Sequence, residues 1–133
     1  MKQLDDDTFE RIAARIVEEC GRRGIQGTFA MVELSTPYSR STIRWQLVLM
    51  ESVLRLNRPS KQDSNSLAIV LAKLAMVIAH MENTGGETNI RGEVPWKGGR
   101  ISADRKFGYA FSGGTQEEDD ELMQFAGLFH ASL

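Results

Sequence analysis

The chain has 133 residues, of which 41% are hydrophobic and 26% charged, proportions typical of a globular protein. Its net charge of −2 argues against nucleic acid as a partner, because nucleic-acid-binding proteins need a basic surface that displaces counterions. The single cysteine excludes an internal disulfide, and the longest apolar run, residues 67–81, is too short to span a bilayer. The acidic N-terminal residues do not resemble a signal peptide. We therefore expect one cytoplasmic domain, residues 1–133, with neither nucleic acid nor membrane as a partner.

A helix is predicted near the N-terminus. Asp7 and Glu10 have the spacing of a capping box, with Asp7 as the residue that caps the first turn. Either Gly21 or Gly24 ends this helix. Apolar residues recur between these limits at helical spacing, and they are Phe9, Ile12, Ala13, Ile16, Val17 and Cys20. Cys20 therefore lies on the apolar face, which favours a core thiol over a reactive one.

Two strands are predicted next, at residues 28–34 and 42–50, on either side of a polar turn that contains Pro37. Apolar and polar residues alternate in the second strand, so that Ile43 and Trp45 share one face. The short connection between the two strands predicts an antiparallel hairpin.

A second helix is predicted over residues 66–82, and it is apolar on nearly every side. A helix of this kind is buried on more than one face. In so small a domain it lies either between the sheet and another helix or in an interface between subunits, and the second alternative predicts a homo-oligomer. Small residues at spacings of three and four allow a neighbour to approach it closely, and they are Ala68, Ala72, Ala75 and Ala79.

Residues 93–103 are predicted to form a short hairpin that turns at Gly98 and Gly99. The last strand covers residues 106–112 and has aromatic residues on one face and small residues on the other, namely Phe107, Tyr109 and Phe111 against Gly108, Ala110 and Ser112. A face without large side chains lets a helix or a ligand approach the backbone. Helices and antiparallel strands are mixed without a βαβ repeat, so the predicted fold class is α+β.

The last helix begins with a capping box formed by Thr115 and Glu118. Acidic residues fill its first turn, where the positive end of the helix dipole stabilises carboxylates. We attribute them to helix initiation rather than to a metal site, since consecutive acids on one turn do not converge on a cation. No residues have zinc-ligand spacing, and we expect no metal. Ser112, Gly113 and Gly114 connect the strand to the helix by a tight turn beside a cavity wall.

Several segments resemble the GlcG/HbpS-like family, which includes the C-terminal domain of PduO-type cobalamin adenosyltransferases. The resemblance is carried by Gly92-Glu-Val-Pro95, by the segment from Ser112-Gly-Gly114 to Asp119, and by Ala68 to Lys73 in the second helix. It implies a profilin-like fold, in which an antiparallel sheet has helices packed on both faces. It also implies assembly into higher oligomers and, as in several members of the family, haem as a candidate ligand.

The basic segment from residue 91 to residue 106 contains candidates for an anion site, because arginine forks bind carboxylates and a tryptophan ring forms an apolar wall. Such a pocket suits haem propionates or a small carboxylated metabolite, although the same cations also fit solvated loops and strand edges. The candidate ligand-binding residues are Arg91, Trp96, Lys97, Arg100, Ser112, Gly113 and Gly114. If the ligand is haem, His80 is the candidate axial ligand.

Three functional hypotheses follow. The leading one is an oligomeric protein that binds a small anionic, tetrapyrrole or aromatic ligand, with the cofactor itself unknown. The second is a small lyase or isomerase that acts on a carboxylated metabolite, and its candidate acid–base residues are Glu33, Glu51, Glu93 and His80. The third is a domain that only assembles. A pocket with convergent arginine and a buried carboxylate would favour the enzyme, and a filled core would favour assembly.

Overall fold

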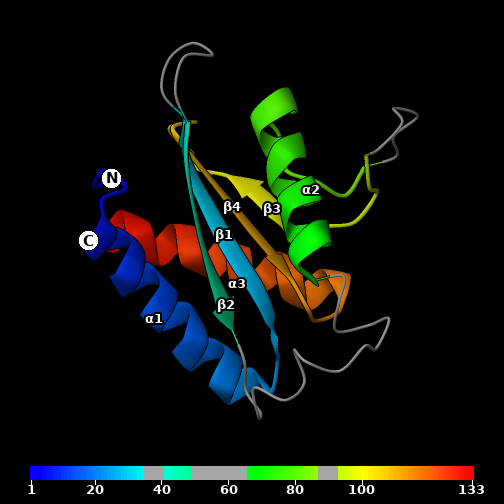
Figure 1. The fold of residues 1–133 in the computed structure, drawn as a ribbon, viewed down its shortest axis with the longest axis horizontal. Helices are drawn as coiled ribbons and strands as arrows, with labels where there is room; N and C mark the ends of the chain where they lie inside the picture. The colour runs from blue at the N-terminus through cyan, green and yellow to red at the C-terminus, as the bar shows by residue number, and fades with distance from the viewer. Residues whose placement is uncertain (35–40, 49–65, 87–92) are drawn as a thin grey trace.

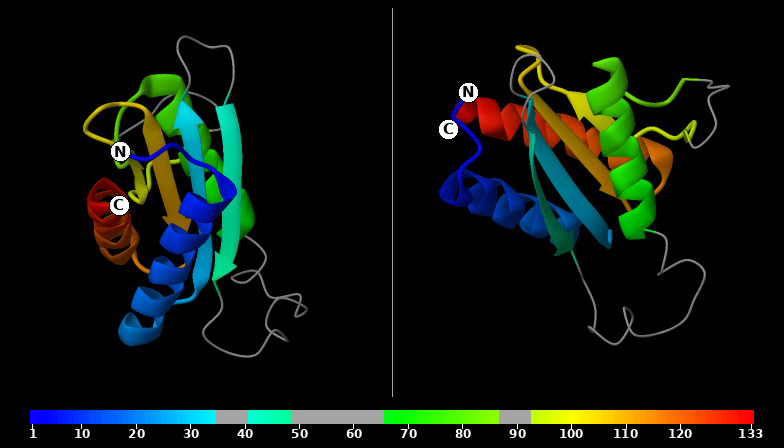
Figure 2. Two further views of the ribbon diagram at one scale, coloured as in Figure 1. Left: turned by 90° about the vertical axis from the view of Figure 1, so that its left-hand side faces the viewer. Right: turned by 45° about the horizontal axis from the view of Figure 1, so that its top comes forward.

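The computed structural model describes residues 1–34, 41–48, 66–86 and 93–133 (Figure 1). Its helices and strands are, in chain order, α1 (Asp6–Arg23), β1 (Gly27–Leu34), β2 (Ser41–Val48), α2 (Ser66–His80), β3 (Gly99–Ile101), β4 (Phe107–Ser112) and α3 (Gln116–Ser132). The strands form one antiparallel sheet in the order β2-β1-β4-β3. Helices α1 and α3 cover one face of this sheet, and α2 covers the other (Figures 1 and 2). The predicted α+β fold with helices on both faces is confirmed.

Helix α1 begins two residues earlier than the capping box predicted. The side chain of Asp5 caps it by accepting a hydrogen bond of 2.7 Å from the backbone N–H of Thr8. The prediction of Asp7 as the cap is wrong, because Asp7 lies inside the first turn and pairs with Arg11 at 3.2 Å. Gly24 ends the helix with a φ of +67°, a conformation that glycine adopts without steric cost.

Cys20 lies in the core that α1 and α3 build against the sheet, and no part of it reaches solvent. Burial raises the pKa of its thiol to about 12. A thiol with so high a pKa carries almost no thiolate at neutral pH, so the predicted core role is confirmed.

The hairpin of β1 and β2 is confirmed, with Gly27 opposite Val48 and Leu34 opposite Ser41. Strand β1 also pairs with β4 and is therefore central in the sheet. Large residues of β1 and β4 point toward α1 and α3, and they are Phe29, Met31, Phe107, Tyr109 and Phe111. Small residues of the same strands point toward α2, as predicted for β4, and they include Ala30, Val32 and Ala110.

The hairpin predicted for residues 93–103 is wrong. Strand β3 begins at Gly99, pairs with β4, and is connected to it through residues 102–106. Gly98 has a φ of +112° and lies so close to other groups that an added Cβ would be 2.7 Å from Lys73 Nζ and 2.8 Å from the carbonyl oxygen of Phe111. The first glycine of the pair therefore marks a close approach of the backbone to α2 and β4, not a two-residue turn.

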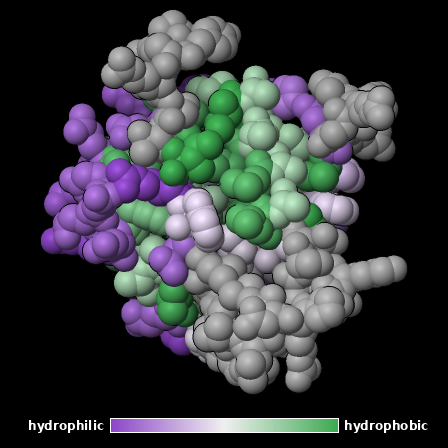
Figure 3. Space-filling view, in the orientation of Figure 1, coloured by the Kyte–Doolittle hydropathy of each residue, from purple (hydrophilic) through white to green (hydrophobic). Residues whose placement is uncertain are grey.

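Helix α2 buries one side only. Val70, Leu74 and Val77 pack on the small-residue face of the sheet, whereas Leu67 and Leu71 on the opposite side are 39% and 40% exposed. Figure 3 shows hydrophobic side chains gathered over this part of the surface. Within the described residues no second helix packs on α2, and both predicted alternatives for its other side, a further helix or a subunit interface, stay predictions. No helix in the described ranges is long and apolar enough to cross a membrane.

Candidate functional site

The turn between β4 and α3 is held by the predicted capping box. The Thr115 hydroxyl oxygen accepts a hydrogen bond of 3.2 Å from the N–H of Glu118, and the Glu118 carboxylate accepts one of 2.9 Å from the N–H of Thr115. These two bonds satisfy backbone donors that the helix itself leaves unpaired.

A buried ion pair lies directly behind this turn. Lys73 Nζ donates to Asp119 Oδ2 at 3.1 Å and to the carbonyl oxygen of Phe111 at 2.9 Å, and the second oxygen of Asp119 accepts from the N–H of Gly114 at 2.8 Å. The two side chains are only 2% and 4% exposed. Burial is the main cause that lowers the pKa of Lys73 and raises that of Asp119, and the attraction between the two charges opposes both shifts.

The sequence interpretation missed this pair. It attributed the whole acidic run to helix initiation, but Glu118 caps the helix, Asp119 binds Lys73, and Asp120 binds Arg100. One signal was available, since Lys73 is the only lysine, arginine or carboxylate residue of a mostly apolar helix and a buried lysine needs a partner.

The predicted ligand residues Ser112, Gly113 and Gly114 lie around this ion pair. Gly113 touches the chain before β1 so closely that an added Cβ would be 1.8 Å from the carbonyl oxygen of Gln26. Gly113 and Gly114 line a shallow polar depression of about 430 Å³ beside Thr115 and Glu118. The Asp119 carboxylate already occupies the N–H of Gly114, so the end of α3 attracts a free anion poorly.

The other predicted ligand residues do not converge on one point. Arg100 on β3 donates two hydrogen bonds of 3.0 Å to Asp120 on α3, which neutralises its charge. The side chains of Trp96 and Lys97 are exposed in the segment that precedes β3, and the N–H of Lys97 donates to the side chain of Gln116 at 3.3 Å. Arg91 lies outside the described residues.

The candidate acid–base residues lie on opposite faces of the sheet. His80, at the C-terminal end of α2, is hydrogen-bonded through Nε2 to the Glu93 carboxylate. Glu33, near the end of β1, accepts a hydrogen bond of 3.1 Å from the N–H of Leu4 on the side of α1. The fourth candidate, Glu51, lies outside the described residues. Among the residues that are described, no group of three or more histidine, cysteine or carboxylate side chains could hold a metal ion.

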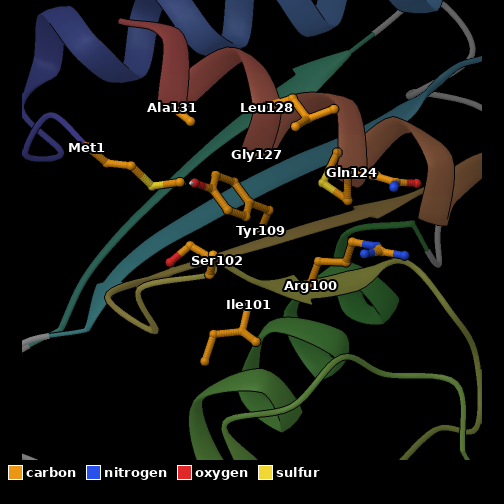
Figure 4. Close-up of a pocket in the computed structure, with 11 residues that line it drawn as sticks. Met1, Arg100, Ile101, Ser102, Tyr109, Gln124, Gly127, Leu128 and Ala131 are labelled. Carbon is orange, nitrogen blue, oxygen red and sulfur yellow. Dashed lines mark hydrogen bonds between the residues drawn. The ribbon is translucent and has the colours of Figure 1, made fainter.

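A cavity of about 210 Å³ lies between α3 and the strands β3 and β4 (Figure 4). We call it the α3 cavity. It is lined by Met1, Arg100, Ile101, Ser102, Ala103, Tyr109, Met123, Gln124, Gly127, Leu128 and Ala131. Figure 4 shows Arg100 and Gln124 at one side of it and Met1 at the other, beside the Tyr109 hydroxyl. The walls are therefore mainly apolar, with Arg100 and Gln124 at one side and the hydroxyl groups of Ser102 and Tyr109 at the other.

Gly127 explains part of this space. It lies within α3, where glycine costs about 1 kcal/mol relative to alanine. A Cβ added there would be 3.7 Å from Tyr109 Cε2, which is ordinary van der Waals contact. No clash requires glycine at this position, and its effect in the structure is to leave the cavity open above the tyrosine ring.

The wall behind Tyr109 contains the buried His130. His130 Nε2 lies 2.7 Å from the carbonyl oxygen of Lys2 and must donate to it, so Nδ1 accepts the hydroxyl proton of Tyr109 at 2.6 Å. Burial lowers the pKa of His130 and raises that of Tyr109. Both groups are therefore neutral near pH 7, and each is already hydrogen-bonded. This arrangement is more typical of residues that support the wall of the cavity than of residues that transfer protons. The sequence interpretation gave His130 no role, because only the folded chain brings it to Tyr109 and Lys2.

Comparison with known proteins shows the fold. No family model and no curated protein matches the sequence. Among solved structures, protein ORFY of Klebsiella pneumoniae, which belongs to the family DUF336, matches with a TM-score of 0.67 and 16% identity over 100% of this chain and 96% of that one. The PduOC:heme complex matches with a TM-score of 0.64 and 15% identity over 96% of this chain and 94% of that one. At the level of the fold, these two neighbours confirm the resemblance to GlcG/HbpS-like and PduO-type proteins.

Proposed function

We propose that this protein binds a small, mostly apolar organic molecule in the α3 cavity, as a divergent member of the GlcG/HbpS-like family. The cavity itself carries the proposal, because it combines apolar walls with Arg100 and Gln124 at one side. Ligand sites commonly have this composition, in which apolar contacts supply affinity and a few polar groups fix orientation.

The size and charge of the cavity define the ligand class. Its volume of about 210 Å³ is below that of pockets for drug-sized ligands, and an apolar cavity of about 150 Å³ holds a benzene ring. Arg100 is already neutralised by Asp120, so a carboxylate would have to compete with Asp120 for the guanidinium. We therefore expect a single-ring or short aliphatic molecule with one neutral polar group, such as an alcohol, to bind more tightly than the corresponding acid.

A titration with benzyl alcohol and with benzoate tests this function. Amide chemical shifts in an isotope-labelled sample should change for Tyr109, Gly127 and Leu128, with the alcohol bound more tightly. Gly127→Ala should weaken binding several-fold by adding a methyl group to the cavity, and Gly127→Leu should abolish it. Glu121→Leu places the same side chain on α3 outside the cavity and should leave binding unchanged. Equal binding of both probes to the wild type and to both Gly127 variants would contradict the proposal.

Haem is the second candidate, because a protein of the same fold, PduOC, binds heme. The α3 cavity is too small to enclose a porphyrin. Of the two histidines, His130 is buried and doubly hydrogen-bonded, whereas His80 is 40% exposed at the end of α2 and is oriented by Glu93. Neither histidine lines the α3 cavity, and a haem bound through His80 would therefore lie at the surface, at the end of α2.

A hemin titration separates the two candidates. A saturable, shifted Soret band that His80→Ala abolishes and Gly127→Leu leaves intact would establish haem as the ligand at the end of α2. No band, or a band unchanged in His80→Ala, would leave the α3 cavity as the candidate site.

We do not propose catalysis, since Glu33 lies on the opposite face of the sheet from His80 and Glu93. The predicted homo-oligomer stays a prediction.

A further inference from the structure

Two hydroxyl groups line the α3 cavity, those of Ser102 and Tyr109 (Figure 4). The Ser102 hydroxyl donates its proton to the Asp104 carboxylate at 2.5 Å. Its oxygen accepts hydrogen bonds from the backbone N–H groups of Lys106 and Phe107, at 3.2 and 3.0 Å. A hydroxyl group has one proton and two lone pairs, so Ser102 has no hydrogen-bonding capacity left for a ligand.

The hydroxyl proton of Tyr109 points away from the cavity, toward His130. The backbone carbonyl of Lys2 can only accept, so its contact of 2.7 Å with His130 Nε2 requires the proton of the neutral imidazole to be on Nε2. Nδ1 is then an acceptor, and its contact of 2.6 Å with Tyr109 Oη requires the tyrosine proton. Burial raises the pKa of Tyr109 and lowers that of His130, which keeps both groups neutral near pH 7. The backbone at Lys2 therefore fixes, through His130, the direction in which Tyr109 donates.

The oxygen of Tyr109 keeps its capacity to accept. Among the described residues none donates a hydrogen bond to it, and its other neighbour is the Met1 sulfur at 3.8 Å. A thioether has no proton to donate, and a ring nitrogen at 2.6 Å is a far stronger acceptor for the tyrosine proton than this sulfur. Met1 is 45% exposed, so a ligand can displace its side chain from Oη. Tyr109 therefore presents an unoccupied acceptor to the α3 cavity.

We propose that Tyr109 selects ligands that donate a hydrogen bond and that His130 is its positioning residue, an inference that rests on the proposed binding of a small molecule in the α3 cavity. A ligand hydroxyl or amide N–H can donate to Tyr109 Oη, whereas a carbonyl or ether oxygen would meet the same lone pairs without a proton between them. At the other side of the cavity Gln124 is exposed, so water competes for hydrogen bonds there. Tyr109 is only 1% exposed, and hydrogen bonds are stronger away from water. The ligand class is thereby narrowed to neutral donors such as alcohols, phenols and amides.

A matched alcohol and ketone test this selectivity. Cyclohexanol and cyclohexanone have the same carbon ring, but only the alcohol can donate. The wild type should bind the alcohol about 3- to 10-fold more tightly, the range expected for one buried hydrogen bond. Tyr109→Phe should remove most of this preference by weakening the alcohol alone. Equal affinities of the wild type for the two ligands, or an equal loss of both in Tyr109→Phe, would overturn the proposal.

Ser102→Ala is the matched control, because it removes the other hydroxyl group of the cavity wall. The Ser102 oxygen is already saturated, so the ratio of alcohol to ketone affinity should stay at the wild-type value. A ratio that falls as far as in Tyr109→Phe would contradict the assignment to Tyr109. His130→Leu removes the acceptor of the tyrosine proton, which can then turn to the cavity, so the preference should shift toward the ketone. A merely structural role of His130 would weaken both ligands alike.

The tautomer of His130 gives a test that needs neither a ligand nor a substitution. Nitrogen chemical shifts of the imidazole should show the proton on Nε2 and none on Nδ1 near pH 7. A proton on Nδ1 would reverse the hydrogen bond with Tyr109 and overturn the proposal, whatever the ligands do. Binding of both ligands without preference would overturn this inference and leave the proposed function standing, whereas failure of both ligands and of benzyl alcohol to bind would overturn the two together.

Discussion

The two faces of the sheet are built from alternate residues of the same two strands, β1 and β4, yet the helices pack on them through side chains of different size. On one face, Phe29, Tyr109 and Phe111 hold α1 and α3 over a layer of large side chains. On the other face, Ala30 and Ala110 let α2 lie close to the backbone. On the first face, the packing leaves the α3 cavity unfilled. On the second face, the buried ion pair of Lys73 and Asp119 lies at one end of the interface between α2 and the sheet.

This difference shows where the molecule tolerates change. Closely packed interiors respond to a single added or removed group, whereas a cavity absorbs an added group with little strain. Substitutions on the α2 face should therefore change stability most, and substitutions around the α3 cavity should change ligand binding most.

Removal of Lys73 should have the largest effect. Lys73→Met leaves the Asp119 carboxylate buried without its cation, and loss of one partner of a buried pair typically costs about 3–5 kcal/mol. The free energy of unfolding in urea should fall by that amount. Lys73→Met combined with Asp119→Asn should recover a large part of the loss, because the amide oxygen can still accept from the N–H of Gly114.

The exposed pair of Arg11 and Asp7 is the control for this prediction. Arg11→Met removes a cation from a pair whose side chains are 54% and 72% exposed, and it should change the unfolding free energy little. A loss in Lys73→Met no greater than that in Arg11→Met would show that the buried pair does not hold the two faces together.

Gly108 tests how tightly α2 lies on the sheet. A Cβ added at Gly108 would be 3.0 Å from Val32 Cγ1 and 3.1 Å from Val77 Cγ1. Gly108→Val adds two further methyl groups to this contact and should cost about 1–3 kcal/mol through overpacking. Thermal unfolding should show the lower stability, and an unchanged midpoint would contradict the close approach of α2.

His130 should make the other face sensitive to mild acid. Burial holds its pKa in the folded protein below the unfolded value, so the unfolded chain binds the proton first as the pH falls. The stabilisation is fully present above the unfolded pKa of about 6.5 and is lost as the pH falls through the folded pKa, at up to about 1.4 kcal/mol per pH unit. Urea unfolding between pH 7 and pH 5 should show a shallower pH dependence in His130→Gln, and equal slopes would argue against a buried, neutral imidazole.

Gly127→Ala should have the smallest effect on stability, and it should be favourable. The methyl group meets Tyr109 at an ordinary contact distance, and alanine favours the helix by up to about 1 kcal/mol. A raised midpoint of thermal unfolding together with weaker binding of benzyl alcohol would separate cavity filling from loss of structure. A lowered midpoint would indicate that the cavity has no room for the added group.

Much of the fold could be predicted, because helices and strands leave recognisable patterns in short stretches of the sequence. The alternation of large and small residues in β4 assigned its two faces, and the capping box at Thr115 placed the start of α3. The errors came where local patterns are degenerate. A Gly-Gly pair is equally compatible with a hairpin turn and with a close approach of the backbone to another element. In the folded chain, Gly98 lies against Lys73 of α2, and this contact distinguishes the two interpretations.

The candidate site was predicted less well, because its residues meet through pairing and packing rather than through spacing along the chain. Asp119 and Lys73 are 46 residues apart, and His130 and Lys2 are 128 residues apart. The α3 cavity depends on Gly127, whose role in α3 is defined only by the distance to the ring of Tyr109. Charge composition predicted Arg100 as a ligand residue, but it could not show that Asp120 already binds it.

The hydrogen bond between Lys2 and His130 brings the two ends of the chain side by side, as Figure 1 also shows. A short peptide could therefore join them, and the resulting circular chain could be opened elsewhere without disturbing the sheet. Because Met1 lines the α3 cavity, a fluorescent group attached at the N-terminus would lie at the rim of the cavity. The position of the termini thus offers an optical reporter for ligand entry that needs no substitution in the binding walls.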